Sequence, residues 1–193
     1  MTFLKNSINL TRMITATKNL ENDHVNILRL IDVMENMSVH KSTDTVHIAT
    51  VIELIRNYAD GVHHAKEEEL LFPLLVKKGF SSEQGPIAVM LHEHDLGRNF
   101  VKGMTEGLKQ YKEGNSTALT MVYEHMTEYR DLLRGHIDKE NNVLFRMVDK
   151  VLTFDEQQHL LNEFAKVENS NICGEAFRKC IQSIDDLETI YHK

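Results

Sequence analysis

The chain has few of the residues that interrupt helices or crosslink small folds. Its 193 residues include two prolines, nine glycines, two cysteines and no tryptophan. So few prolines and glycines, beside abundant leucine, methionine, glutamate and lysine, favour helix throughout. Two cysteines are too few for a disulfide framework, which favours a reducing cytoplasm. On one helix, Cys173 and Cys180 would lie about 10 Å apart along the axis, too far for a disulfide, so we expect partly buried structural thiols.

Long apolar runs and a dominant positive charge are also missing. No segment approaches the roughly 20 uninterrupted apolar residues of a membrane span. Residues 1–18 lack the apolar stretch and small-residue cleavage site of a signal peptide. The net charge of -7 and the pI near 5.9 give no electrostatic reason to expect nucleic acid. We therefore expect a cytoplasmic protein that binds neither nucleic acid nor a membrane.

The chain does contain a series of amphipathic segments separated by turn signals. The four long segments span residues 15–37, 44–78, 86–112 and 117–151. Thr153 and Glu156 form a capping-box pattern that opens a shorter helix near 154–168, and a last helix is expected over 175–191. Strand alternation and hairpin signals are absent. Short loops between four long helices predict an all-α, up-down-up-down four-helix bundle.

The chain is expected to divide into two parts. Residues 15–151 form the bundle, and residues 152–193 form a C-terminal extension of one or two helices packed on it. An amphipathic pair of helices could cap the bundle, form a dimer surface or contact a partner, and its size favours capping. The sequence leaves the oligomeric state open.

Each of the four long segments places one histidine on its apolar face. Residues at i, i+3, i+4 and i+7 share a helix face. In the first segment His24 falls in line with Leu20 and Ile27. In the other three segments, the histidines placed in the same way are His63, His94 and His136.

Two of these histidines belong to a repeated motif. HHAKEEELLF at 63–72 and HIDKENNVLF at 136–145 share the pattern His-x-x-Lys-Glu-x-x-(Leu/Val)-Leu-Phe. Glu67 and Glu140 therefore follow their histidines by one turn on the same face. The pairs DH and EH, ending at His24 and His94, precede the two motifs by 39 and 42 residues. The chain is thus a duplicated helical hairpin in which each half supplies two histidines and one glutamate.

Six ligand-type side chains in one apolar interior indicate a metal centre. Buried without compensation, each imidazole or carboxylate would cost several kcal/mol, and metal ions remove that cost by binding the lone pairs. This imidazole-rich set suits iron or manganese and admits zinc, whereas the lack of thiolate argues against iron–sulfur or structural zinc. We expect two ions bridged by both carboxylates and an oxo or hydroxo group. An open position facing an apolar pocket would suit O2 or NO.

Two lysines occupy equivalent positions just before the motif glutamates. Lys66 and Lys139 either pair with Asp23 and Glu93, and so orient the histidines, or are solvated. The sequence leaves both interpretations open.

The other polar residues near the motifs are expected to lie outside the ligand set. His64 and Glu68 share a polar face with Asp60, and we expect them to be solvated or to lie behind the ligands. His92 is two residues, or about 200° of helix rotation, from the third ligand histidine and cannot reach the same metal. Tyr129 lies on the ligand face, where core packing is favoured over lining a pocket. The histidines expected at the surface are His40, His47, His125, His159 and His192.

The elements NDHVNIL, HHAKEEELLFP, GPIAVMLHEHDLGR and HIDKENNVLF resemble the hemerythrin-like (HHE cation-binding) family. They are similar in particular to its bacterial and archaeal members and to di-iron cluster-repair proteins. The resemblance covers residues 15–150 and is specific, because four motifs occur in order at suitable spacing. It implies a four-helix bundle around a non-haem di-iron centre. The ligands it implies are those that helix phase selects: His24, His63, Glu67, His94, His136 and Glu140.

One departure from the family's oxygen carriers bears on function. The carriers have a fifth histidine one turn before the position of His94, where this chain has Met90. A centre with one more open coordination position than a carrier has favours chemistry with NO, peroxide or redox iron over simple reversible oxygenation. We therefore expect a di-iron protein that reacts with O2, NO or peroxide in sensing, stress response or iron handling. The alternatives are a reversible O2-binding or iron-storage module without catalysis, and a bundle in which metal is purely structural.

Overall fold

The computed structural model describes residues 14–170 and 174–191. Every regular element in these ranges is a helix, which confirms the all-α prediction. None of the described helices is long and apolar enough to cross a membrane. Cys180 is buried, whereas Cys173 and His192 lie outside the described residues.

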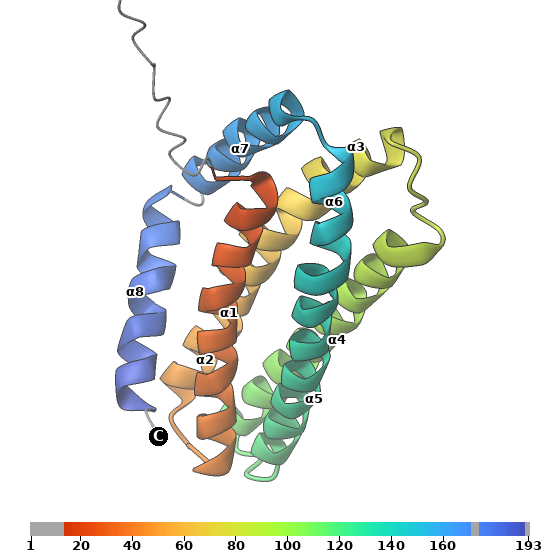
Figure 1. The fold of residues 1–193 in the computed structure, drawn as a ribbon. Helices are drawn as coiled ribbons and strands as arrows, with labels where there is room; N and C mark the ends of the chain where they lie inside the picture. The colour runs from red at the N-terminus through yellow and green to blue at the C-terminus, as the bar shows by residue number, and fades with distance from the viewer. Residues whose placement is uncertain (1–13, 171–173, 192–193) are drawn as a thin grey trace, which may run out of the picture.

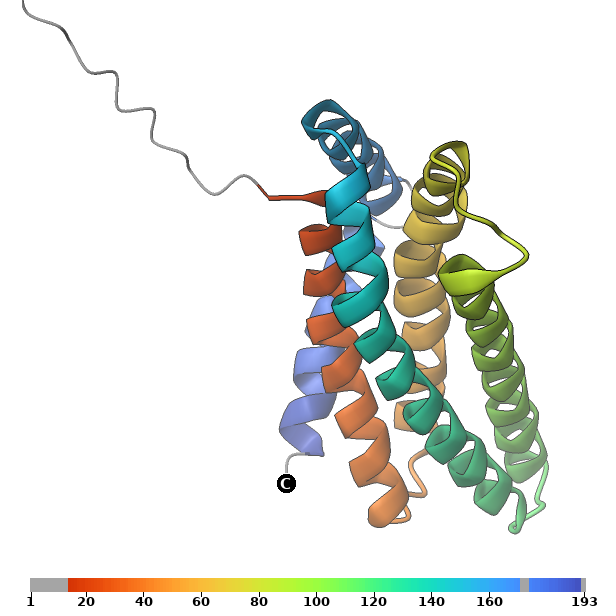
Figure 2. The same ribbon diagram turned by 45° about the vertical axis from the view of Figure 1, so that its right-hand side comes forward.

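Four long rods form the bundle, and two further helices pack against it (Figure 1). The first rod is α1 (Ala16–Val39) and the third is α4 (Gly85–Lys112). The second rod consists of α2 (Thr45–Leu54), η1 (Ile55–His64), η2 (Lys66–Leu71) and α3 (Phe72–Lys77). The fourth consists of α5 (Ala118–Lys139), η3 (Glu140–Leu144) and α6 (Phe145–Val151), and the C-terminal helices are α7 (Phe154–Asn169) and α8 (Gly174–Ile190). Figure 2 shows the four rods side by side along most of their length.

The helix starts follow the capping signals of the sequence. Thr15 accepts a hydrogen bond from the backbone N–H of Lys18, and the Asp44 side chain caps the second rod. Thr153 and Glu156 form both hydrogen bonds of a capping box at the start of α7, as predicted. These side chains satisfy backbone N–H groups that have no partner within the helix.

Wider helical turns interrupt the second and fourth rods. The segments η1, η2 and η3 are π-helical, so their N–H groups bond to carbonyls five residues back instead of four. The wider turns carry more residues each, so successive side chains are rotated by a smaller angle. This local change of phase was not predictable from a fixed 3.6-residue period, and it falls on both repeated motifs.

The apolar interior consists of two clusters with a polar layer between them. One cluster includes Ile31 of α1, Ala59 of the second rod and Tyr129 of α5, towards the α1–α2 and α4–α5 turns. The other includes Leu20 and Phe145, nearer the opposite end of the bundle. Along each rod, the predicted histidine or glutamate ligands lie where the residues of one cluster give way to those of the other. The bundle thus encloses its buried polar groups within apolar walls.

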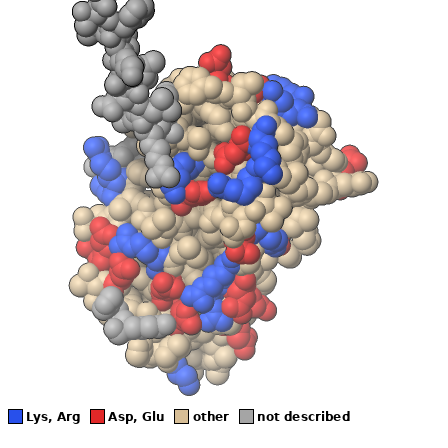
Figure 3. Space-filling view, viewed as in Figure 1, with Lys and Arg blue, Asp and Glu red and all other residues tan. Residues whose placement is uncertain are grey.

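The two C-terminal helices pack on the rods. The side chain of Gln157 in α7 accepts a hydrogen bond of 2.8 Å from the backbone N–H of Ala16, at the start of α1. Arg29 of α1 pairs with Asp185 and Glu188 of α8. Acidic and basic side chains are interspersed over the face shown in Figure 3.

Candidate metal centre

The six predicted ligands meet in the buried polar layer, and all four rods contribute. His24 belongs to α1 and His94 to α4, whereas the second and fourth rods each supply a histidine and a glutamate. None of the six is more than 1% exposed. Helix phase therefore correctly predicted that these side chains point into one interior.

The histidines form one close pair in each half of the repeat. Nε2 of His24 lies 2.9 Å from Nε2 of His63, and Nε2 of His94 lies 3.2 Å from Nε2 of His136. The carboxylate of Glu140 lies between the pairs, because its Oε2 is 3.1 Å from the His24 Nε2 and 3.4 Å from the His136 Nε2. Oε2 of Glu67 is 3.5 Å from the His94 Nε2.

Each ring is oriented through its other nitrogen. The Nδ1 atoms of His63, His94 and His136 face carboxylates, at distances of 3.3, 2.6 and 2.9 Å respectively. Nδ1 of His24 lies 2.8 Å from Oδ1 of Asn141. Because these oxygens accept hydrogen bonds, each Nδ1 carries the proton and each Nε2 of a neutral ring presents a lone pair. Two facing lone pairs repel unless a proton or a cation lies beside them.

The carboxylates show the same deficit of positive charge. Both side-chain oxygens of Glu67 and of Glu140 are buried without a hydrogen-bond partner. Native proteins rarely leave so many buried oxygens unsatisfied. Four carboxylate oxygens and four inward Nε2 atoms are a donor set that suits hard or borderline metal ions. The residues present therefore fit a metal pair.

In the metal-free chain, protons take the place of the cations. Burial, together with the charge of Glu140, raises the pKa of Glu67 well above its usual value. Burial lowers the pKa of His63, but the Glu67 charge and the hydrogen bond to Asp23 outweigh it and raise that pKa to about 10. Burial and the His63 charge lower the pKa of His24. Metal ions must therefore displace protons from this layer.

The two motif lysines bind the predicted acids but differ in burial. Lys66 is completely buried and donates to Asp23 Oδ2 and to Asn19 Oδ1, each at 2.9 Å. It also pairs with Glu168 of α7, a contact that the sequence did not predict. Lys139 pairs with Glu93 while its side chain stays 43% exposed. The C-terminal extension thus contacts residues that orient the candidate ligands of the first half.

His64 and Glu68 lie closer to the centre than their polar helix face indicated. Glu68 orients the His94 ring. Of the two positions expected for Glu68, solvated or behind the ligands, the structure therefore shows the second. His64 is only 4% exposed, so the alternative of a solvated side chain is wrong for it. The wider turn of η1 accounts for this error, because it alters the phase on which the expectation rested. One feature of the sequence could have indicated the buried position of His64. Asp60 lies one turn before it, where a carboxylate can hydrogen-bond to the imidazole and orient it next to His63.

A small pocket runs from the surface to this part of the centre. Its volume is about 170 Å³, and it lies between η1, α4 and α5. Its lining includes His64, the buried Tyr129 and apolar Val101, with Arg98 among the charged residues. The hydroxyl of Tyr129 is buried without a hydrogen-bond partner. Tyr129 thus both packs in the core and lines the pocket.

The remaining sequence expectations can be compared directly with burial. Met90 is 2% exposed and packs in an apolar cluster, as expected for a residue that is not a ligand. His92 is exposed. The predicted surface histidines within the described residues are exposed or partly exposed: His40, His47, His125 and His159.

Comparison with known proteins agrees with the resemblance noted in the sequence. The family model described as the hemerythrin HHE cation-binding domain matches residues 15–148, well over half of the chain. No solved structure gave a significant match.

The curated relatives that match are named for cluster repair. A "Probable iron-sulfur cluster repair protein" of Haemophilus influenzae is 31% identical over 126 residues, covering 63% of this chain and 55% of that protein. "Iron-sulfur cluster repair protein YtfE" of Pectobacterium carotovorum is 36% identical over 110 residues, covering 55% and 49%. The protein of the same name from Escherichia coli is 40% identical over 87 residues, covering 43% and 39%. The chain therefore spans about half or less of the length of these relatives.

Proposed function

We propose that this chain, which belongs to the hemerythrin HHE cation-binding family, is a cytoplasmic non-haem di-iron protein. In this proposal it reacts with O2, NO or peroxide in sensing, stress response or iron handling. The observation that carries the proposal is the set of four buried carboxylate oxygens without partners, facing the Nε2 atoms of four histidines.

The proposed ligands divide into two groups that share one carboxylate. His24, His63 and Glu140 form one group, with a ligand atom of each within 4.8 Å of the others. A second group of the same kind consists of Glu67, His94, His136 and Glu140. Glu140 belongs to both groups, and Oε2 of Glu67 lies 3.7 Å from the His63 Nε2 and 3.5 Å from the His94 Nε2, so both carboxylates are placed to bridge two ions. The same donors also suit manganese and admit zinc. We propose iron because the chemistry proposed here requires a metal that gives up electrons, which zinc does not.

Bound at this place, two adjacent iron ions would supply the two electrons needed to reduce one O2 or peroxide or to couple two NO molecules. The chain's own residues prepare that chemistry. Asp23, Glu68 and Glu93 hold protons on the outer ring nitrogens, so that the inner nitrogens stay free to bind metal. The apolar clusters on both sides exclude bulk water. The small pocket limits access to small molecules, in keeping with diatomic ligands or peroxide.

The names of the curated relatives favour one physiological context. Because those proteins are called iron-sulfur cluster repair proteins, we propose that this chain handles iron or NO when such clusters are damaged. Reversible O2 binding is the competing function, and it predicts a stable adduct that releases O2 when the gas is removed.

The test is to measure iron per chain and to record the visible spectrum of the reduced protein before and after O2 and NO. We expect two iron ions per chain, prompt oxidation by O2 and a spectral change with NO. A spectrum that reverts when O2 is removed would favour the carrier. Less than two iron per chain in the fully loaded protein would refute the centre. His24→Ala should lose iron, whereas His40→Ala, at an exposed position, should keep it.

A further inference from the structure

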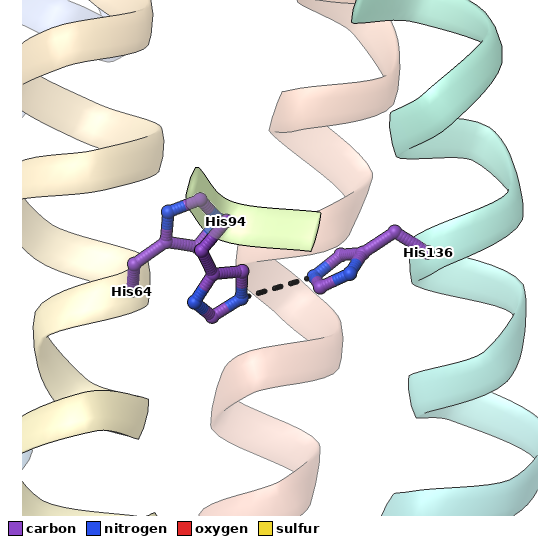
Figure 4. A group of neighbouring side chains, drawn as sticks. All are labelled: His64, His94 and His136. Carbon is purple, nitrogen blue, oxygen red and sulfur yellow. Dashed lines mark hydrogen bonds between the residues drawn. The ribbon is translucent and has the colours of Figure 1, made fainter. Parts of the chain in front are cut away.

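A fifth imidazole lies at the edge of the centre, outside the predicted ligand set. The ring of His64 stacks on that of His94, with centroids 3.8 Å apart and planes inclined by 13°. A ring nitrogen of His64 also lies within 4.8 Å of one nitrogen each of His94 and His136. Figure 4 shows His64 and His94 side by side, with the His136 ring opposite them. His64 is therefore a close neighbour of the ion that the other two histidines would share.

The stacking decides what His64 can do at this place. The lone pair of an imidazole nitrogen lies in the plane of its ring, so the lone pairs of two nearly parallel rings run side by side and do not meet at one ion. The lone pair of His64 would thus pass beside the ion bound by His94, offset from it by about the distance between the stacked rings. A small ligand on that ion would occupy this space.

Two hydrogen bonds fix which edge of each ring faces the centre. Nδ1 of His64 lies 3.1 Å from Oδ1 of Asp60. Nδ1 of His94 lies 2.6 Å from Oε1 of Glu68. Arg98 donates to both of these oxygens, from Nε at 2.9 Å to Asp60 and from Nη2 at 2.7 Å to Glu68. Both rings therefore turn Nδ1 towards Arg98 and Nε2 away from it, towards the centre.

The inner nitrogen of His64 is an acceptor without a donor. Because the Asp60 carboxylate holds a proton on Nδ1, the Nε2 of the neutral ring carries a lone pair. This Nε2 is buried, and none of the described residues donates a hydrogen bond to it. Burying such an acceptor is unfavourable unless a donor reaches it. A donor from outside the protein would meet that need.

We propose that Nε2 of His64 accepts a hydrogen bond from a small ligand on the ion held by His94 and His136, and that the site thereby selects ligands that carry a proton. The proposal rests on the metal pair proposed above and narrows its reactants. O2 and NO have no proton to donate, whereas water and hydrogen peroxide do. Hydrogen peroxide is therefore the reactant that this centre fits best.

The pocket from the surface reaches the centre on the same side. His64 is part of its lining, together with Asp60 and Arg98, whereas His94 is not. A molecule that enters through this pocket therefore meets the His64 ring before it meets the ring that would hold the ion. This order places His64 next to an incoming ligand and not behind the protein ligands.

The test reads the state of the His64 Nε2 directly. Nitrogen NMR spectra are recorded on the full-length chain with isotope-labelled histidine, before and after loading with zinc, and the His64 signal is assigned by its absence in His64→Gln. Nε2 of the four ligand histidines should shift strongly on loading. Nε2 of His64 should show the smaller shift of an acceptor bonded to zinc-bound water. The azide anion, which displaces water and has no proton, should reverse that smaller shift.

The outcomes of this measurement separate the two proposals. An unchanged His64 signal in protein with two zinc ions per chain would overturn the role of His64 and leave the centre intact. A shift as large as that of the four ligand histidines would also overturn it, because His64 would then be a ligand itself. Fewer than two zinc ions per chain would overturn the centre.

Matched variants separate hydrogen bonding from packing. The azide affinity of the cobalt(II)-loaded protein is read from its visible spectrum. His64→Leu has no acceptor, so bound water loses its hydrogen bond and azide should bind about 2- to 10-fold more tightly. His64→Gln, whose amide oxygen can accept, should restore much of the original affinity. His92→Leu, at an exposed position on α4, should leave it unchanged.

Unchanged or weaker azide binding in His64→Leu would contradict the proposal, since a ring that only packs gives no reason for tighter binding. If His64→Leu does not fold, the nitrogen spectra of the unsubstituted protein decide the question.

Discussion

The two motif lysines should respond unequally to the same substitution. Lys66 is completely buried between Asn19, Asp23 and Glu168. Lys139 occupies the equivalent position in the other half, but its side chain is 43% exposed where it pairs with Glu93. Methionine at either position keeps much of the side-chain length and removes the charge. The pair therefore separates the effect of burial from the effect of the motif.

The expected losses of stability follow from that difference in burial. Removing one partner of a buried ion pair costs about 3–5 kcal/mol, because the other charge stays buried. Asp23 keeps its contact with His63, and Glu168 is 23% exposed, so Lys66→Met should lie near the lower limit. An exposed pair contributes about 0–1 kcal/mol, which sets the upper limit for Lys139→Met. The two variants should therefore differ by about 2 kcal/mol or more.

The assay is unfolding of the metal-free protein by urea and by heat. For a chain of this size, each kcal/mol lowers Tm by about 2–4 °C, so Lys66→Met should lose about 6–12 °C and Lys139→Met no more than about 4 °C. Equal losses in the two variants would refute the reasoning, because both lysines carry the same charge in the same motif. So would a loss below about 1 kcal/mol for Lys66→Met, since that is the range of an exposed pair.

Four further predictions concern the carboxylates, proton release on metal binding, the pH dependence of stability and the helix cap. Glu140→Gln and Glu67→Gln should each reduce binding of both metal ions, because each carboxylate lies beside histidines of both pairs; metal titrations in which either variant weakens one ion only would contradict this. Because the pKa values of Glu67 and His63 are raised in the metal-free fold, metal loading near pH 7 should release protons, and calorimetry in buffers of different ionisation enthalpy should detect them. The same raised pKa means that metal-free stability falls as pH rises above 4.5, the usual value for Glu67, and Glu67→Gln should flatten that fall. Thr153→Ala should cost about 1 kcal/mol in urea unfolding through loss of the capping box, without changing metal content.

Local sequence signals were sufficient for most of the helical architecture. The apolar period and the breaks near Gly79 and Gly114 predicted the rods to within a few residues, and the capping box at Thr153 predicted the start of α7. These signals act over one or two turns, so they can be read without knowing what packs against each helix. The inward direction of the six candidate ligands follows from the same period, because each histidine replaces an apolar residue on a buried stripe.

Tertiary structure decided which of these side chains lie close to one another. That Glu140 lies between both histidine pairs depends on how the fourth rod is placed against the other three. The contact of Lys66 with Glu168 joins residues 102 positions apart, through a C-terminal helix whose docking site no local pattern specifies.

The sequence by itself therefore determined four amphipathic rods, a duplicated motif and an interior rich in imidazole and carboxylate. It could not place His64, because a fixed period of 3.6 residues assigns that position to the polar face. The wider turns of η1 changed its direction, and the packing of α4 brought His94 against it. Helix phase is a local property that sequence carries. The meeting of three rings from three rods is a property of packing, and only the folded chain determines it.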